Sequence, residues 1–361
     1  MMSATPALPL IVALVALVAL DAYVLLAGAD FGGGVWDLLA SGPRRDQQRA
    51  LVADAIGPIW EANHVWLILV VVLLFTCFPP AFSGLAIALH IPLTLMLIGI
   101  VLRGSAFAFR TYGSEADASQ RRWGRVFAIA SLLTPLVLGM CIGAIASGRV
   151  GEALRSADAA ANGTARLAFA QLYLAPWLTP FTIAVGALTI ALFAFLAAVY
   201  LTVEATDAEL REDFRRRALA AALAVFVTAF GALLLSRSLA PRVSQGLTAS
   251  RWALPLHALT AGAAVGAIVA LWTRRWRLAR LCAAAQVSFI LFGWAAAQAP
   301  FIVPPTLTLQ AAAAPRRTLI LFLIALAVGA VALFPSLAYL FRVFKSRDAL
   351  QAEPDTSITS H

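Results

Sequence analysis

The feature that most constrains this chain is a series of apolar stretches, each long enough to cross a lipid bilayer. The first contains thirteen consecutive apolar residues, Leu8 to Leu20. A spanning helix needs about 20 mostly apolar residues. Nine segments meet this requirement: 8–29, 62–80, 82–109, 124–147, 178–204, 217–237, 254–273, 279–299 and 317–342. We therefore predict an all-α, polytopic transmembrane helical bundle.

The composition excludes several other classes of protein. Hydrophobic residues make up 61% of the chain and charged residues 12%, against about 45–50% and about 25% in a soluble domain. A soluble protein could not hide so much apolar surface, because roughly a quarter of its unfolded surface stays exposed on folding. A soluble enzyme, a disordered chain and a nucleic-acid-binding domain are thus excluded, and no nucleic-acid partner is expected.

The basic residues predict how the bundle lies in the membrane. With the N-terminus outside, 18 of the 27 Lys and Arg residues fall in cytoplasmic segments, 8 fall outside, and Arg103 lies within a span. This excess predicts an outer N-terminus and a cytoplasmic C-terminus. We expect one transmembrane domain over 1–345, an interfacial helix from Leu167 to Leu174, and a disordered cytoplasmic tail over 346–361.

A short internal echo suggests how the spans are grouped. The first span ends with Tyr23 seven residues before Asp30, and the fifth with Tyr200 seven residues before Asp207. The match fits two parallel four-helix halves, within 1–147 and 178–345, plus a peripheral helix. A chance resemblance between two helix ends explains it equally well.

Ionisable residues at membrane depth are the candidate functional groups, because burying one costs about 2.5–3.5 kcal/mol on insertion scales. Asp21 lies near the middle of the first span, and Asp30 precedes three glycines that permit unwinding or close backbone approach. Asp30 is either a plain boundary residue or a buried partner of Arg103. Arg103 either extends to the interface or pairs with Glu61 or Asp30. The remaining candidates are Glu61, His64, His90, Glu204 and His257.

The segment 56–66 is the most unusual in the chain. Pro58 suits the first turn of a helix, and helical spacing places Glu61 and His64 on one face and Trp60 and Asn63 on the adjacent face. One interpretation is a charged rim at the membrane interface, anchored by tryptophans. The other is a proton-conducting or cofactor-adjacent site.

No pattern in the sequence predicts a metal ligated by this chain. The three cysteines lie far apart in apolar stretches and form no CxxC or Cys/His cluster. The single Glu61-x-x-His64 lacks the second ExxH that a di-iron site needs. A turn at Pro80 would place His64 and His90 about 9 Å apart in depth, which is poor for one haem iron. His90 and His257 can instead bond backbone groups freed by nearby prolines.

Three stretches resemble subunit II of the bd-type quinol oxidases. They are Gly28-Ala-Asp-Phe-Gly32, then Ile56-Gly-Pro-Ile-Trp-Glu-Ala-Asn-His-Val-Trp-Leu67, then Arg103-Gly-Ser-Ala-Phe-Ala-Phe-Arg110. The family has Gly-x-Asp-hydrophobic-Gly, Ile-Gly-Pro-x-Trp-Asp-Gly-Asn-x-Val-Trp-Leu and Arg-Gly-x-Ala-Phe-Glu-Phe-Arg. In this chain Glu61 replaces the usual Asp, Ala62 the Gly, and Ala108 the Glu. A proton route that depends on the family's glutamate at this last position lacks its carboxylate here, because Ala108 replaces it.

The resemblance implies a role in the bacterial cytoplasmic membrane as the haem-free partner of a haem-bearing subunit I. Haems b and d, or b only, would lie in that partner, where quinol is oxidised and oxygen is reduced to water. A structural quinone, bound lipid and a small accessory subunit are further expectations. Glu61 would serve a cytoplasmic proton path with Trp60, Asn63 and His64 beside it. Asp30, Arg103 and Asp21 would be charged partners in the bundle.

Other functions compete with this interpretation. Nine spans and intramembrane acids also suit a proton-coupled secondary transporter, although paired discontinuous helices are not evident in both halves. A stand-alone membrane cytochrome and an assembly subunit without a proton role are further alternatives.

Overall fold

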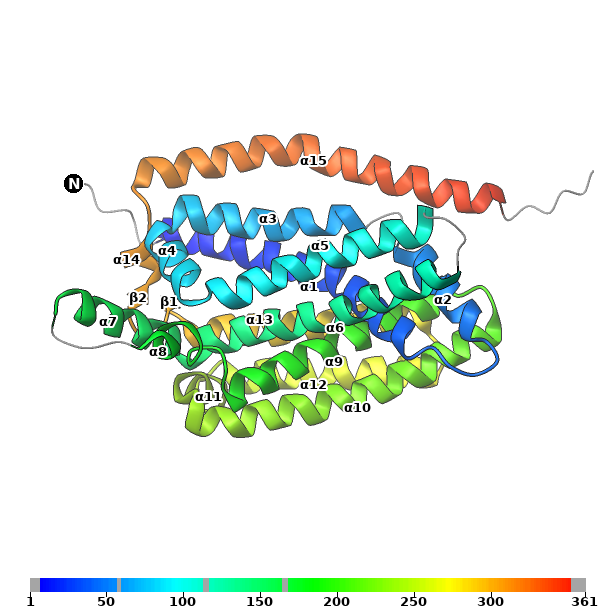
Figure 1. Ribbon diagram of the computed structural model, residues 1–361, viewed down its shortest axis with the longest axis horizontal. Coiled ribbons are helices and arrows are strands. Elements are labelled where there is room, and N and C mark those ends of the chain that lie inside the picture. The colour runs from blue at the N-terminus through cyan, green and yellow to red at the C-terminus, as the bar shows by residue number, and fades with distance from the viewer. Residues whose placement is uncertain (1–6, 57–59, 113–116, 164–167, 352–361) are drawn as a thin grey trace, which may run out of the picture.

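A computed structural model describes residues 7–56, 60–112, 117–163 and 168–351. The long helices lie side by side in one bundle, with short elements gathered at its two ends (Figure 1). In chain order the helices are α1 (Ala7–Leu38), α2 (Arg45–Ile56), α3 (Trp60–Cys77), α4 (Pro79–Ala88), α5 (His90–Tyr112), α6 (Asp117–Ser147), α7 (Arg149–Ala161), α8 (Phe169–Tyr173), α9 (Pro180–Glu204), α10 (Ala208–Leu239), α11 (Pro241–Ala249), α12 (Ala253–Trp272), α13 (Trp276–Gln298), α14 (Leu309–Ala312) and α15 (Arg316–Gln351). The strands β1 (Phe301–Val303) and β2 (Leu307–Thr308) form a small antiparallel hairpin.

The predicted fold class is confirmed, with one correction to the spans. Within the described ranges, eight helices are long and apolar enough to cross a membrane, or nine if the bent pair α3 and α4 counts as one span. The chain bends by 117° between the two helices of that pair. The prediction of one helix over 82–109 was wrong, because α4 ends at Ala88 and α5 begins at His90. Pro79 and Pro80 begin α4, where a missing N–H costs nothing.

The first helix continues to Leu38, nine residues past its predicted end, and its glycines do not unwind it. They allow close contact between backbones. A Cβ at Gly32 would overlap the carbonyl oxygen of Phe193 on α9, and one at Gly34 would overlap the Ser131 side chain on α6. The sequence allowed either unwinding or close backbone approach at these glycines, and the structure shows close backbone approach.

The spans α6 and α9 are the most buried of the described candidates, and α9 packs against α1, α6 and α10. Its inner residues, such as Phe193, Phe195 and Leu196, are almost fully buried. The helices α1 and α9, which contain the two tyrosines of the echo, Tyr23 and Tyr200, thus lie against each other, while Asp207 is the N-cap of α10. By contrast, α15 runs along the edge of the bundle (Figure 1) and is mostly exposed.

The end of the bundle that carries α2 is crossed by an ion-pair cluster. The Arg44 side chain donates from Nε and Nη2 to the two carboxylate oxygens of Asp213, both at 2.8 Å, and from Nη1 to Glu209 at 2.6 Å. The hydrogen bond to Asp213 raises the pKa of Arg44 above its ordinary value. The cluster joins the loop after α1 to α10, and so joins the first half of the chain to the second.

Several segments outside the spans differ from the predictions, among them α2, α11 and the β1–β2 hairpin, which were not predicted. The connection between α6 and α9 carries α7, which was not foreseen, and α8 within the predicted interfacial helix. The final helix α15 continues to Gln351, so the first residues of the predicted disordered tail are helical. The rest of that tail, 352–361, lies outside the described residues.

Candidate functional site

The side chain of Arg103 on α5 is 2% exposed and lies where α1, α5 and α6 meet. Its Nη2 atom lies 3.5 Å from Oδ1 of Asp30 and donates to the Asp30 carbonyl oxygen at 3.1 Å. Its Nε atom donates to the Ser131 hydroxyl at 3.2 Å. Of the two alternatives for Arg103, the structure has the buried pair with Asp30 rather than a side chain extended to the interface.

Aromatic rings complete the environment of the guanidinium. Its carbon lies 4.8 Å from the centre of the Phe31 ring and 5.2 Å from that of Phe127. An arginine held over ring faces gains favourable electrostatic energy where water is excluded. Such a pair is costly to bury, but once it is buried the loss of one partner is strongly destabilising. Arg103 and Asp30 therefore each need the other to be buried without an uncompensated charge.

Asp30 is bonded on both carboxylate oxygens. Oδ1 faces Arg103, and Oδ2 accepts a hydrogen bond from Nδ2 of Asn63 on α3 at 3.2 Å. Asp30 is 3% exposed and Asn63 1%. The carboxylate thus links α1, α3 and α5. The close contact at Gly34 brings Ser131 of α6 to the same arginine.

Two polar atoms beside this pair have no hydrogen-bond partner among the described residues. They are Oη of Tyr23 on α1 and Nδ1 of His64 on α3, and both are buried. The two rings have centroids 5.9 Å apart, and the His64 ring lies 6.1 Å from that of Phe31. Buried polar atoms normally have a partner. Tyr23 and His64 therefore bring two unsatisfied hydrogen-bonding groups next to the Asp30–Arg103 pair.

Two of the predicted site residues, Trp60 and Glu61, have side chains outside the described part of the chain. Their backbone forms the first turn of α3, with Glu61 three residues before His64. Their place at the start of a helix agrees with the sequence analysis. The position of the Glu61 carboxylate relative to Asp30 and Arg103 stays a prediction.

Sequence reasoning missed Asp37, which is 3% exposed and forms a second ion pair between α1 and α5. Its Oδ1 lies 3.0 Å from Nη1 of Arg110 and 3.9 Å from Nε of Arg49. Asp37 follows Asp30 by seven residues, and Arg110 follows Arg103 by seven. Two turns of helix keep residues on one face. The matching intervals were the signal that could have predicted this second pair.

Asp21 does not join this cluster. It accepts a hydrogen bond from the Ser288 hydroxyl of α13 at 2.9 Å through Oδ2, while its buried Oδ1 has no partner in the described structure. Glu204, another candidate, lies 3.5 Å from Arg280 at the ends of α9 and α13. The guanidinium of Arg280 in turn lies 4.6 Å from the centre of the Tyr200 ring.

The histidines are dispersed. His90 bonds the carbonyl of Ile87 at 3.0 Å, and His257 bonds that of Leu247 at 2.7 Å. These carbonyls lie near the ends of α4 and α11, so they are freed by helix ends rather than by proline, which corrects the prediction. Across the described ranges no three His, Cys, Asp or Glu side chains gather as a metal site would require.

The fold and the buried Asp30–Arg103 pair define a multi-pass membrane protein with a charged site inside its helix bundle. The chain belongs to the family described as cytochrome bd terminal oxidase subunit II, whose sequence model matches residues 8–344. The resemblance inferred from the three sequence stretches is therefore confirmed.

Individual relatives agree with this assignment. The chain is 31% identical over 120 residues to cytochrome bd ubiquinol oxidase subunit 2 of Bacillus subtilis. It is 27% identical over 129 residues to cytochrome bd-I ubiquinol oxidase subunit 2 of Escherichia coli. The alignments cover 33% and 36% of this chain and 34% and 33% of those relatives. The chain thus spans about a third of the length of the curated relatives it matches.

The fold itself has a solved counterpart. A chain in the structure of bd oxidase from Geobacillus thermodenitrificans matches with a TM-score of 0.73, over 94% of this chain and 98% of that chain. The sequence identity is 20%, so this match concerns the fold.

Proposed function

We propose that this chain is the haem-free subunit II of a bd-type terminal oxidase, which oxidises quinol and reduces oxygen to water. The match of the family across residues 8–344 is the observation that carries the proposal. Haems b and d, or b only, belong to a partner, subunit I, and supply the electron transfer and the oxygen chemistry. The contribution of this chain is to stabilise the heterodimer and to provide polar groups inside the membrane.

The residues of this chain support a haem-free role. Two of its histidines hold helix-end carbonyls, and His64 lies against the rings of Tyr23 and Phe31. None of these contacts in the described structure joins two histidines, whereas a bis-histidine haem needs two facing ligands. A structural quinone and a small accessory subunit remain part of the proposal on the strength of the resemblance.

The proposed setting is the bacterial cytoplasmic membrane with the N-terminus outside. The distribution of 18 and 8 basic residues supports this orientation. In it, the end of the bundle with α2 and the Arg44 cluster faces the cytoplasm, together with the first turn of α3. A proton that enters from the cytoplasm would meet Glu61 first and then His64.

A visible spectrum tests the partnership. The chain is purified from its native membrane with whatever associates, and then separated from those partners. We expect haem bands that accompany a larger co-purifying subunit and are absent from the isolated chain. A colourless chain without a partner that moves a solute into liposomes would instead support the rival transporter.

The proposed proton path is supported by two buried polar atoms, Tyr23 Oη and His64 Nδ1, which have no hydrogen-bond partner among the described residues. His64 follows Glu61 by three residues on α3. Proton transfer through a positioned side chain commonly contributes a hundredfold or more. In the assembled oxidase we expect Glu61→Ala to lower quinol-driven oxygen consumption and proton uptake about tenfold or more.

The control is Glu152→Gln, on the exposed first turn of α7, which should leave both rates unchanged. A Glu61→Ala oxidase that assembles normally and keeps full turnover and proton uptake would remove Glu61 from the path. The partnership with subunit I would survive that result, since the spectrum tests it separately.

A further inference from the structure

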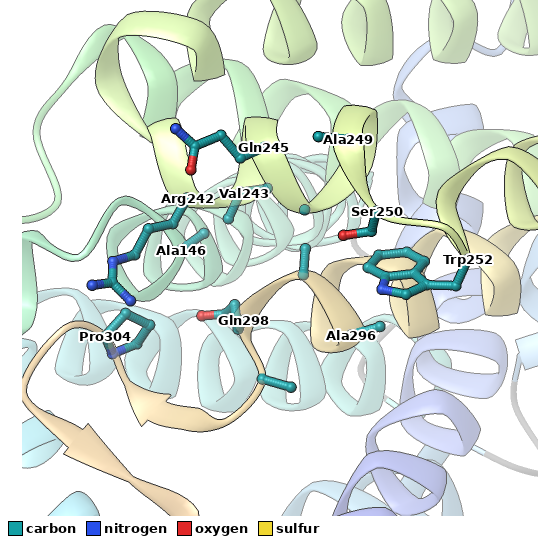
Figure 2. A pocket seen from close by; sticks show the side chains of 13 residues that line it. Ala146, Arg242, Val243, Gln245, Ala249, Ser250, Trp252, Ala296, Gln298 and Pro304 are labelled. Atoms are coloured by element: carbon teal, nitrogen blue, oxygen red, sulfur yellow. The ribbon is translucent and has the colours of Figure 1, made fainter.

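A cavity of about 640 Å³ opens at the end of the bundle opposite α2, away from the Asp30–Arg103 pair. It lies between α11, the last turn of α13 and the loop that leads into the β1–β2 hairpin (Figure 2). Its polar and aromatic lining comprises Arg242, Gln245, Ser250, Trp252 and Gln298. Neither the sequence motifs nor the proposed proton path uses any of them.

The position of the cavity corresponds to the headgroup level of a bilayer. The spans around it end or begin at its edge: α10 ends at Leu239, α12 begins at Ala253 and α13 ends at Gln298. Trp252 is of the residue type enriched at membrane–water interfaces. Leu254, two residues further on, is 78% exposed and offers apolar surface for an acyl chain. A lipid could therefore reach the cavity without leaving the bilayer.

The charge of the cavity favours an anion. Arg242 is exposed, and its guanidinium carbon lies 4.7 Å from the centre of the Phe301 ring, which holds the cation at the cavity wall. Among the residues that line the cavity, all in the described part of the chain, none is acidic. A guanidinium in a fixed position is well suited to bind phosphate oxygens.

A second group at the cavity requires a hydrogen-bond donor. Gln298 is 8% exposed, and its Oε1 atom has no partner among the described residues. A buried amide oxygen accepts hydrogen bonds but cannot donate them. Figure 2 shows Gln298 and Arg242 toward one side of the cavity and Ser250 and Trp252 toward the other. A ligand that places an anion at Arg242 and a donor at Gln298 would satisfy both groups.

We propose that this cavity binds the anionic phosphodiester headgroup of a phospholipid that also carries hydroxyl donors, as phosphatidylglycerol does. The phosphate lies against Arg242, and a headgroup hydroxyl donates to Oε1 of Gln298. A headgroup with a net negative charge matches Arg242, the one cationic side chain among the lining residues, since none of those residues is an acid that could bind an ammonium group. The expected order of affinity is phosphatidylglycerol, then phosphatidylethanolamine, then phosphatidylcholine.

Native mass spectrometry of the complete complex, released from detergent after incubation with each lipid, tests this order. Loss of the charged contact in Arg242→Gln should weaken phosphatidylglycerol binding about tenfold. The matched control is Arg251→Gln, an exposed arginine at the same end of the bundle that does not line the cavity. It should bind as the wild type does.

A second variant tests the donor. Gln298→Leu should reduce the preference for phosphatidylglycerol over phosphatidylcholine while Arg242 still attracts phosphate. Equal binding by the Arg242 and Arg251 variants, or equal affinity for all three lipids, would overturn the proposal. Displacement of phosphatidylglycerol by inorganic phosphate or glycerophosphoglycerol at the same concentration would also overturn it, because the site would then take a soluble phosphate rather than a lipid.

Discussion

Two of the three carboxylates on helix α1, Asp21 and Asp30, lie nine residues apart and have opposite surroundings. Asp30 has a partner on each oxygen, with Arg103 on one side and Asn63 on the other. Asp21 has the Ser288 hydroxyl on one oxygen, and its other oxygen is buried without a partner among the described residues. Among the described residues, Asp30 is thus part of an ion pair and Asp21 is not.

The difference shows what makes a membrane carboxylate structurally important. An acid paired with an arginine cannot be changed alone, because its removal leaves a buried charge without compensation. An acid bonded only to a hydroxyl leaves no such charge behind. The stability of this chain should therefore depend on Asp30 and Arg103 far more than on Asp21, although all three are ionisable residues inside spans.

The largest effect is expected from Arg103→Leu. Among the described residues, this change leaves Asn63 as the side-chain partner of the buried Asp30 carboxylate. Breaking such a pair costs about 3–5 kcal/mol. We expect a large loss of assembled complex, measured as yield and as thermal unfolding in detergent. The double variant Asp30→Asn/Arg103→Leu should recover part of the loss, because no isolated charge remains. A double variant less stable than Arg103→Leu would show that the ion pair is not the cause.

The single variant Asp30→Asn should have a smaller effect. It leaves Arg103 charged, but the Asp30 backbone carbonyl, the Ser131 hydroxyl and two aromatic rings still surround the guanidinium. Asparagine also keeps an oxygen that accepts a hydrogen bond from Asn63. A loss of about 2 kcal/mol is expected in the same unfolding measurement. A loss as large as that of Arg103→Leu would mean that these other contacts do not hold the arginine.

The sequence predicted the helices well and the contacts between them only in part. Apolar length determined the spans, because a bilayer imposes about 20 residues on each. The break at Leu89 was missed because the apolar pattern continues through α4 into α5, so hydropathy alone does not mark the bend. The pairing of Asp30 with Arg103 was among the alternatives, but the sequence could not select it, because the pair depends on how α1 and α5 pack against each other. Asp37 was overlooked because it follows the predicted end of the first span.

The second ion pair between α1 and α5, Asp37 with Arg110, tests whether burial of the arginine determines how much stability is lost when its partner is removed. Asp37 is as buried as Asp30, but the side chain of Arg110 is 25% exposed. Water can therefore solvate the arginine when its partner is removed, and solvent screening weakens the pair. We expect Asp37→Asn to cost about 1 kcal/mol, measured by thermal unfolding beside Asp30→Asn. An equal cost for the two variants would show that exposure of the cation does not matter.

The smallest change in stability is expected from Asp21→Asn. This variant tests the comparison between Asp21 and Asp30 most directly. Within the described residues no basic side chain pairs with Asp21, so the change strands no charge. Asparagine can keep the hydrogen bond from Ser288 through its carbonyl oxygen. The unfolding free energy should change by no more than about 0.5 kcal/mol, as for most substitutions that break no network. Ser288→Ala is the companion variant, since it removes the hydroxyl that donates a hydrogen bond to Asp21. A loss of several kcal/mol in Asp21→Asn would mean that this acid has a charged partner in the assembled complex, contributed by another subunit.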